Sequence, residues 1–200
     1  MPIKQKCKAL VYGQHGNPSQ VLQLTQHSSL ANGIDESLLQ SSPGSLIQVK
    51  MLTANINPSD INQIEGICPS RYNLPAVAGN EGVGEVMSSS NGFNIGDRVG
   101  FYGQGVWREP EILVPPEMLC KMSSKIDPSI SCNILVNPLT AYLMLKEVKE
   151  GDLIIQNGAN SSVGMALIQI AKKKSIKTIN VIRGERSDFQ ELKEELEKLG

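Results

Sequence analysis

From residue 151 onward, the apolar positions alternate between short continuous runs and helical spacing. The runs at 153–155 and 178–182 predict strands, the first of them suited to burial on both faces. Apolar residues at helical spacing predict a helix over 163–174, ended by lysines that complement its dipole. A second helix is expected before Gly200, with an apolar stripe of Phe189, Leu192, Leu196 and Leu199. This β-α-β-α order is typical of the start of a doubly wound nucleotide-binding fold.

Two parallel strands leave open sheet edges and half-covered apolar faces. A dinucleotide site of this class also needs the second half of the fold. The pattern therefore predicts a truncated nucleotide-binding domain, in the front part of a larger protein.

Residues 8–150 have a different pattern, with short strand-like runs separated by Gly-, Pro- and Asn-containing turns. Helices are expected at 60–65 and 139–146, and a loop or insertion at 28–44. The expected strands are 9–12, 45–52, 82–87, 97–101 and 111–114. Short strands at this spacing predict a β-rich barrel or sandwich-like domain.

Composition narrows the function classes. The 200 residues are 40% hydrophobic and 20% charged, with a net charge of −1, so no basic excess points to nucleic acid. No apolar run approaches the roughly 20 residues that span a bilayer, and no targeting segment is readable. The four cysteines form no C-x-x-C pair and there are only two histidines. A structural metal site is therefore not expected.

The segment 157–164, Asn-Gly-Ala-Asn-Ser-Ser-Val-Gly, joins the first strand of the final region to its helix. Such a turn can direct backbone N–H groups and the positive helix end at a pyrophosphate. Only Gly158 and Gly164 remain of an ideal G-x-G-x-x-G motif, and the serines are also suited to be helix N-caps. The alternative is an ordinary strand–helix turn.

The end of the second strand indicates which dinucleotide would bind. NAD sites usually place an acidic residue there, on the ribose 2′-hydroxyl. Here the strand runs into Arg183-Gly184-Glu185-Arg186. Arginine suits a 2′-phosphate through a bidentate, charge-assisted contact, so the sequence favours NADPH. The alternative is a solvated loop of mixed charge, in which Glu185 weakens the preference.

Taken together, the motifs resemble the medium-chain dehydrogenase/reductase superfamily, and within it the zinc-free mitochondrial 2-enoyl thioester reductases. The resemblance runs in order over nearly all of 8–200. It rests on Ala-Leu-Val-Tyr-Gly-Gln-His-Gly at 9–16, Asn-Pro-Ser-Asp-Ile-Asn at 57–62, Gly-Asn-Glu-Gly at 79–82, Gly-Asp-Arg-Val at 96–99, Val-Asn-Pro-Leu-Thr-Ala-Tyr at 136–142, and the turn and strand end described above. The zinc enzymes of the superfamily carry a histidine where Asn80 stands, so the resemblance implies no metal.

This resemblance implies a mixed α/β protein with a GroES-like barrel domain at 1–130 and a partial Rossmann NADPH-binding domain at 131–200. Hydride would pass from the nicotinamide to C3 of a trans-2-enoyl thioester, with protonation at C2. Family cofactor roles would carry over to Asn137 near the nicotinamide and to Asn160, Ser161, Ser162 and Val163 at the phosphates. Arg183 with Gly184 and Glu185, or Arg186 after a one-residue shift, would meet the 2′-phosphate.

The catalytic acid is where the chain departs from the family. The family tyrosine follows the helix after the Asn-Pro-Ser-Asp motif, and Cys68 occupies that position. A thiol is a shorter and weaker hydrogen-bond donor than a phenol. Tyr72, four residues on, is the other candidate, and a third reading is that neither residue serves.

The function implied by the resemblance is NADPH-dependent enoyl-CoA or enoyl-acyl-carrier-protein reduction in mitochondrial fatty-acid synthesis. Its partner would be the thioester, carried by coenzyme A or by acyl-carrier protein, and family members are commonly homodimers. Mitochondrial localisation follows only from the resemblance. Two alternatives stay open: a non-catalytic binding or interaction protein derived from such a reductase, and a zinc-free quinone oxidoreductase.

Overall fold

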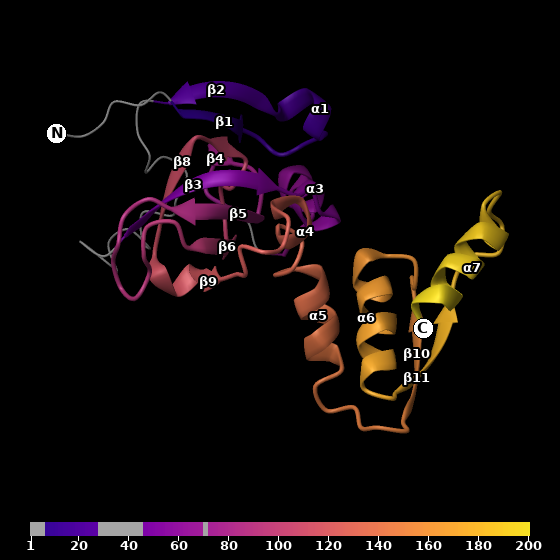
Figure 1. Ribbon diagram of the computed structural model, residues 1–200. Coiled ribbons are helices and arrows are strands. Elements are labelled where there is room, and N and C mark those ends of the chain that lie inside the picture. The colour runs from indigo at the N-terminus through magenta and orange to yellow at the C-terminus, as the bar shows by residue number, and fades with distance from the viewer. Residues whose placement is uncertain (1–6, 28–45, 70–71) are drawn as a thin grey trace. The chain divides into compact units, whose positions relative to one another are not determined.

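The computed structural model describes residues 7–27, 46–69 and 72–200, so the loop expected at 28–44 lies outside it (Figure 1). The chain separates into two compact units, Met1–Asn133 and Ile134–Gly200. Each unit has its own hydrophobic clusters. The sequence placed the boundary three residues earlier, after residue 130.

The first unit is built from two antiparallel sheets. In one of them β1 pairs with β2, β4 and β7, and the other has the order β8-β3-β5-β6-β9. The strands are β1 (Cys7–Tyr12), β2 (Gln23–His27), β3 (Ile47–Ala54), β4 (Ala76–Val77), β5 (Glu81–Val86), β6 (Arg98–Tyr102), β7 (Arg108–Glu109), β8 (Glu111–Val114) and β9 (Leu119–Lys121). This confirms the β-rich part of the expected fold. Within the described residues the sheet of β8 to β9 stays open and does not close into a barrel.

Alternation along the strands explains the core of the first unit. In β3, Ile47 and Val49 are fully buried, whereas Lys50 is exposed. Val49 faces Val86 across the β3–β5 ladder, and both belong to one buried aliphatic cluster. A two-residue period of this kind fixes the strand register, because a slip by one residue would expose the whole apolar face.

The described helices of the first unit each begin with a proline, whose fixed φ suits the first helical turn. In α3 (Pro58–Glu65), Asn57 and Asp60 form a capping box, and Gly66 ends the helix in the left-handed conformation at φ 77°. The other helices are α1 (Pro18–Val21), η1 (Pro116–Met118) and α4 (Pro128–Ser131).

The second unit has the predicted β-α-β-α order, preceded by a helix. Its elements are α5 (Asn137–Met144), β10 (Leu153–Asn157), α6 (Ser162–Lys173), β11 (Lys177–Val181) and α7 (Phe189–Leu199). The two strands pair in parallel. Helix α6 packs on α5 through Ala141, Leu145 and Leu167, and on α7 through Ile168, Leu192 and Leu196. Because β10 and β11 are parallel, their carboxyl ends lie together beside the start of α6.

The prediction that the first strand of this unit is buried on both faces is wrong. Ile154 packs into the α5–α6 cluster, but Leu153 is 60% exposed and Ile155 is 71% exposed. Helices cover only one face of the two-stranded sheet within the described residues, so alternate residues of β10 face outward.

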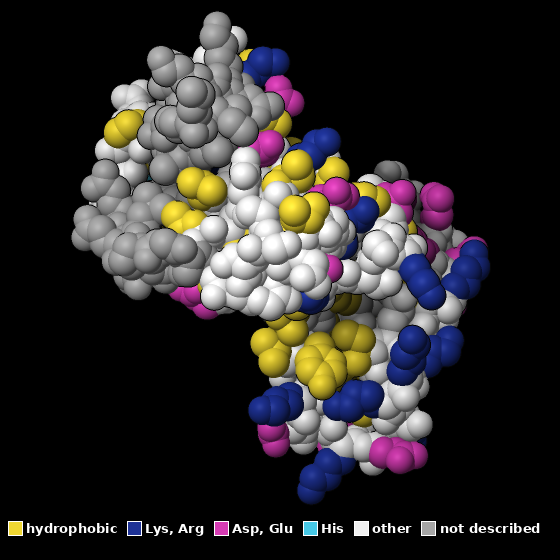
Figure 2. Space-filling model, turned by 60° about the vertical axis from the view of Figure 1, so that its left-hand side comes forward, with side chains coloured by type: hydrophobic (Ala, Val, Ile, Leu, Met, Phe, Trp, Pro, Cys, Tyr) yellow, Lys and Arg dark blue, Asp and Glu magenta, His cyan; other side chains and the backbone are white. Residues whose placement is uncertain are grey.

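Besides the outward face of β10, helix α5 also exposes apolar side chains in the second unit. Ala141 and Leu145 face α6, while the rest of the helix surface exposes Leu139, Tyr142, Leu143 and Met144. Figure 2 shows exposed hydrophobic side chains on this side of the second unit, with Lys and Arg side chains nearby. None of the helices in the described ranges is long and apolar enough to cross a membrane.

Candidate functional site

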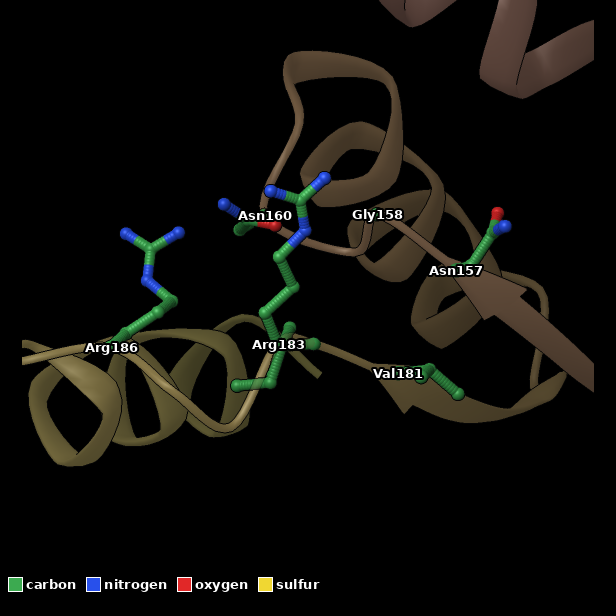
Figure 3. Close-up of a pocket in the computed structure, with 7 residues that line it drawn as sticks. Asn157, Gly158, Asn160, Val181, Arg183 and Arg186 are labelled. Carbon is green, nitrogen blue, oxygen red and sulfur yellow. The ribbon is translucent and has the colours of Figure 1, made fainter.

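A cavity of about 530 Å³ opens at the carboxyl ends of β10 and β11. Ligands of open α/β sheets bind in this position, outside the carboxyl ends of the strands. The cavity is lined by Asn157, Gly158, Asn160, Val181, Ile182, Arg183 and Arg186. Figure 3 shows Arg183 extending toward the turn that carries Gly158 and Asn160, with Arg186 extending in the same direction.

The turn before α6 owes its shape to two glycines and a serine. Gly158 has a φ of 60°, which favours glycine. A Cβ on Gly164 would lie 2.6 Å from the carbonyl oxygen of Ala159, so the helix starts in close contact with the turn. The N–H of Gly164 donates to Ser161 Oγ at 3.0 Å, which makes Ser161 the N-cap of α6. The N–H groups of Ser162 and Val163 are then the donors that this helix end can offer to an anion.

The two arginines of the cavity differ in their surroundings. Arg186 donates from Nε and Nη2 to the two carboxylate oxygens of Asp188, at 2.8 and 2.7 Å. This hydrogen-bonded ion pair raises the pKa of Arg186 and lowers that of Asp188. No hydrogen bond or ion pair within the described part of the chain holds the Arg183 side chain. Arg183 is therefore available to an anion in the cavity.

Several other residues predicted to bind the cofactor do not line the cavity. Val163 packs its side chain into the α5–α6 cluster. Asn137 is buried at the first position of α5 and does not line the cavity. Gly184 and Glu185 are exposed in the loop after β11, also outside the lining.

Sequence reasoning gave no separate role to Asn157, Val181 or Ile182. All three come at the end of a parallel strand, and that position is a usable signal for a ligand site.

The cavity residues fit the phosphate-bearing end of a dinucleotide. Guanidinium groups present paired N–H donors with the geometry of a phosphate. The volume lies within the usual range of small-molecule sites. The tight glycine turn brings backbone near the cavity, as a pyrophosphate contact requires.

The first unit contains the two candidate proton donors. The hydroxyl of Tyr72 donates to Asn80 Oδ1 at 2.5 Å, and Asn80 Nδ2 donates to Asp60 Oδ1 at 2.7 Å. Burial raises the pKa of Tyr72 to about 12, and burial also raises the pKa of Asp60. Cys68 is half-buried just after the Gly66 cap of α3. Tyr72 is thus linked by way of the Asn80 amide to a buried carboxylate.

A second buried carboxylate, Glu81, belongs to the same polar region. Its Oε2 accepts from Asn55 Nδ2 at 2.8 Å and from Asn57 Nδ2 at 3.1 Å. At Asn80, where the resemblance places the histidine of the zinc enzymes, this chain has an amide that bridges Tyr72 and Asp60. Within the described ranges, no group of three His, Cys, Asp or Glu side chains could hold a metal ion.

Comparisons with known proteins agree with this architecture. Residues 43–123 match the alcohol dehydrogenase GroES-like domain family. The chain is 44% identical to the mitochondrial enoyl-[acyl-carrier-protein] reductase of Rattus norvegicus, covering 96% of this chain and 51% of that protein. The protein of the same name in Homo sapiens is 42% identical, over 98% of this chain and 51% of its own length. The chain thus spans about half the length of these curated relatives.

Solved structures give the same result. The Etr1p/NADP/crotonyl-CoA complex is similar with a TM-score of 0.79 and 32% identity, covering 98% of this chain and 59% of that one. A putative NADPH:quinone reductase from Bacillus thuringiensis is similar with a TM-score of 0.81 and 27% identity, covering 98% and 56%. The higher sequence identities are to the enoyl thioester reductases. Nearly the whole chain is therefore similar to mitochondrial enoyl thioester reductases, of which it spans about half the length.

Proposed function

We propose that this chain contributes to the NADPH-dependent reduction of trans-2-enoyl thioesters. The carrying observation is the cavity at the carboxyl ends of β10 and β11, with Arg183 and Arg186 in its lining. The names of the relatives, and the NADP and crotonyl-CoA bound to Etr1p, support the same chemistry.

In this proposal the second unit holds the adenosine end of the cofactor. Arg183 binds the 2′-phosphate, and Asn160 with the N–H groups of Ser162 and Val163 binds the pyrophosphate. When bound, the cofactor supplies a hydride to C3 of the enoyl thioester. Ser161 acts on the turn rather than on the phosphate, because its hydroxyl caps α6.

We propose Tyr72, rather than Cys68, as the proton donor of the first unit. A phenol is a stronger hydrogen-bond donor than a thiol. With its pKa raised to about 12, Tyr72 is protonated at neutral pH and keeps a proton to give. The hydrogen bond to Asn80 holds the hydroxyl in place until a substrate oxygen or carbon replaces that acceptor.

The relatives also suggest a location and partners. Mitochondrial localisation is proposed from the names of the curated relatives. Etr1p also forms a heterodimer with Etr2p in Candida tropicalis, so assembly through a second reductase chain, including a homodimer, is proposed here too. The acyl group would be carried by coenzyme A or by acyl-carrier protein.

The test is NADPH oxidation by the purified chain with a short trans-2-enoyl-CoA, beside the Tyr72→Phe and Cys68→Ala variants. The proposal expects turnover that Tyr72→Phe lowers by about 10²-fold or more, the range of general acid catalysis, and that Cys68→Ala lowers by less than about threefold. Faster oxidation with a quinone would instead favour the quinone reductase reading. Thioester binding without turnover would favour an interaction protein.

A further inference from the structure

The segment 183–188 carries as many negative as positive side chains. Arg183 and Arg186 are balanced by Glu185 and Asp188, so the net charge of the segment is zero. Recognition of a phosphate here cannot come from net charge. It depends on which guanidinium group is free to present its N–H donors.

Asp188 occupies one complete edge of Arg186. Its carboxylate accepts from Nε and Nη2 at 2.8 and 2.7 Å. This edge offers two parallel donors, the arrangement that a phosphate would otherwise use. Asp188 also stands at the N-cap position of α7, yet its side chain makes no capping hydrogen bond. The carboxylate therefore binds the arginine and does not cap the helix.

We propose that Asp188 competes with the 2′-phosphate of NADPH for Arg186 and so limits the preference of this site for NADPH over NADH. The inference rests on the proposed function, because it assumes that the cavity holds the cofactor. A 2′-phosphate must either displace Asp188 or take the remaining N–H groups of Arg186 beside a carboxylate of like charge. Arg183 consequently carries most of the phosphate affinity.

The test is calorimetric titration of the full chain with NADPH, NADH and 2′,5′-ADP at one fixed ionic strength. Asp188→Asn removes the charge, and Asp188→Ser keeps a side chain able to cap α7. Glu191→Gln is the matched control, since it removes one negative charge from the first turn of the same helix. Both Asp188 variants are expected to bind NADPH and 2′,5′-ADP about three- to tenfold more tightly, with NADH affinity unchanged. The control is expected to stay within about twofold of the natural chain.

A double-mutant cycle separates competition for Arg186 from a general charge effect. In an Arg186→Ala background, Asp188→Asn should no longer tighten NADPH binding. The inference is overturned if Asp188→Asn tightens NADPH binding equally in the Arg186→Ala background. It is also overturned if the natural chain binds NADPH and neither Asp188 variant binds it more tightly. In both cases the proposed function still stands. Absence of NADPH binding by the natural chain and by every variant overturns the proposed function together with it.

Discussion

Gly164, the third residue of α6, has no space for a side chain. An added Cβ would lie 2.6 Å from the backbone oxygen of Ala159 and 2.7 Å from that of Gly158. Because both obstacles are backbone atoms, Gly164→Ala must open the turn and is expected to lower the free energy of unfolding by about 1–3 kcal/mol. Urea denaturation of the natural chain and of Gly164→Ala measures this loss in the free energy of unfolding. Gly184→Ala, with open space around its Cβ, is the matched control and should change stability little. Equal stability of the two variants would contradict the close packing at Gly164.

Tyr72 makes a prediction about alkaline pH. Its folded-state pKa is raised from 10.0 to about 12, so the folded state favours the protonated phenol. The stability from this group is fully present below pH 10 and is lost as the pH rises through about 12. The measurement is a spectrophotometric titration of the natural chain and of Tyr72→Phe, with circular dichroism to show that both remain folded. The difference between their tyrosinate absorbances should appear near pH 12. A midpoint near 10 in the folded chain would contradict the burial of this hydroxyl.

At the scale of elements, α6 depends on its N-cap. Ser161 Oγ accepts from the N–H of Gly164 at 3.0 Å, whereas Ser162 is exposed at the first helical position. Ser161→Ala is therefore expected to lower the free energy of unfolding by about 1 kcal/mol, and Ser162→Ala by clearly less. Thermal unfolding without cofactor compares the two variants. A larger loss in Ser162→Ala would show that the cap is misassigned.

Strand β10 offers a matched pair of neighbouring isoleucines on opposite faces. Ile154 packs into the α5–α6 cluster and Ile155 is 71% exposed. Threonine keeps the β-branched shape, so Ile154→Thr should cost about 1–3 kcal/mol and Ile155→Thr less than about 0.5 kcal/mol. Chemical denaturation of both variants measures the difference. Similar losses would mean that both faces of the strand are covered.

The elements that the sequence predicted best are those whose pattern is local. The spacing of apolar residues in α6 and α7 identifies both helices, and Gly200 caps α7 as expected. Strands β2, β4, β7 and β9 were not predicted. They are short or rich in polar residues, and their pairing with β1 or β6 provides a stability that no local pattern shows. The burial of β10 was misjudged because an apolar run does not tell how many of its faces are covered.

In the whole molecule, the cofactor cavity could be predicted from the sequence, whereas the polar chain around Tyr72 could not. Arg183, Arg186 and the turn at Asn160 lie at strand ends, where the order of elements alone brings them together. The chain from Tyr72 through Asn80 to Asp60 joins residues from separate segments, so their spacing gives no sign of it. The pairing of Asp188 with Arg186 was also missed, although their spacing of two residues was a usable signal.

The proposed function depends above all on the second unit holding a 2′-phosphorylated dinucleotide through Arg183. The most direct measurement is a fluorescence titration of the chain with NADPH and with NADH, repeated for Arg183→Ala. NADPH is expected to bind about tenfold or more tightly than NADH, as a charge-assisted contact provides. Arg183→Ala is expected to remove this preference and to leave NADH affinity unchanged. Equal affinities for the two cofactors in the natural chain, or an NADPH preference that persists in Arg183→Ala, would contradict it.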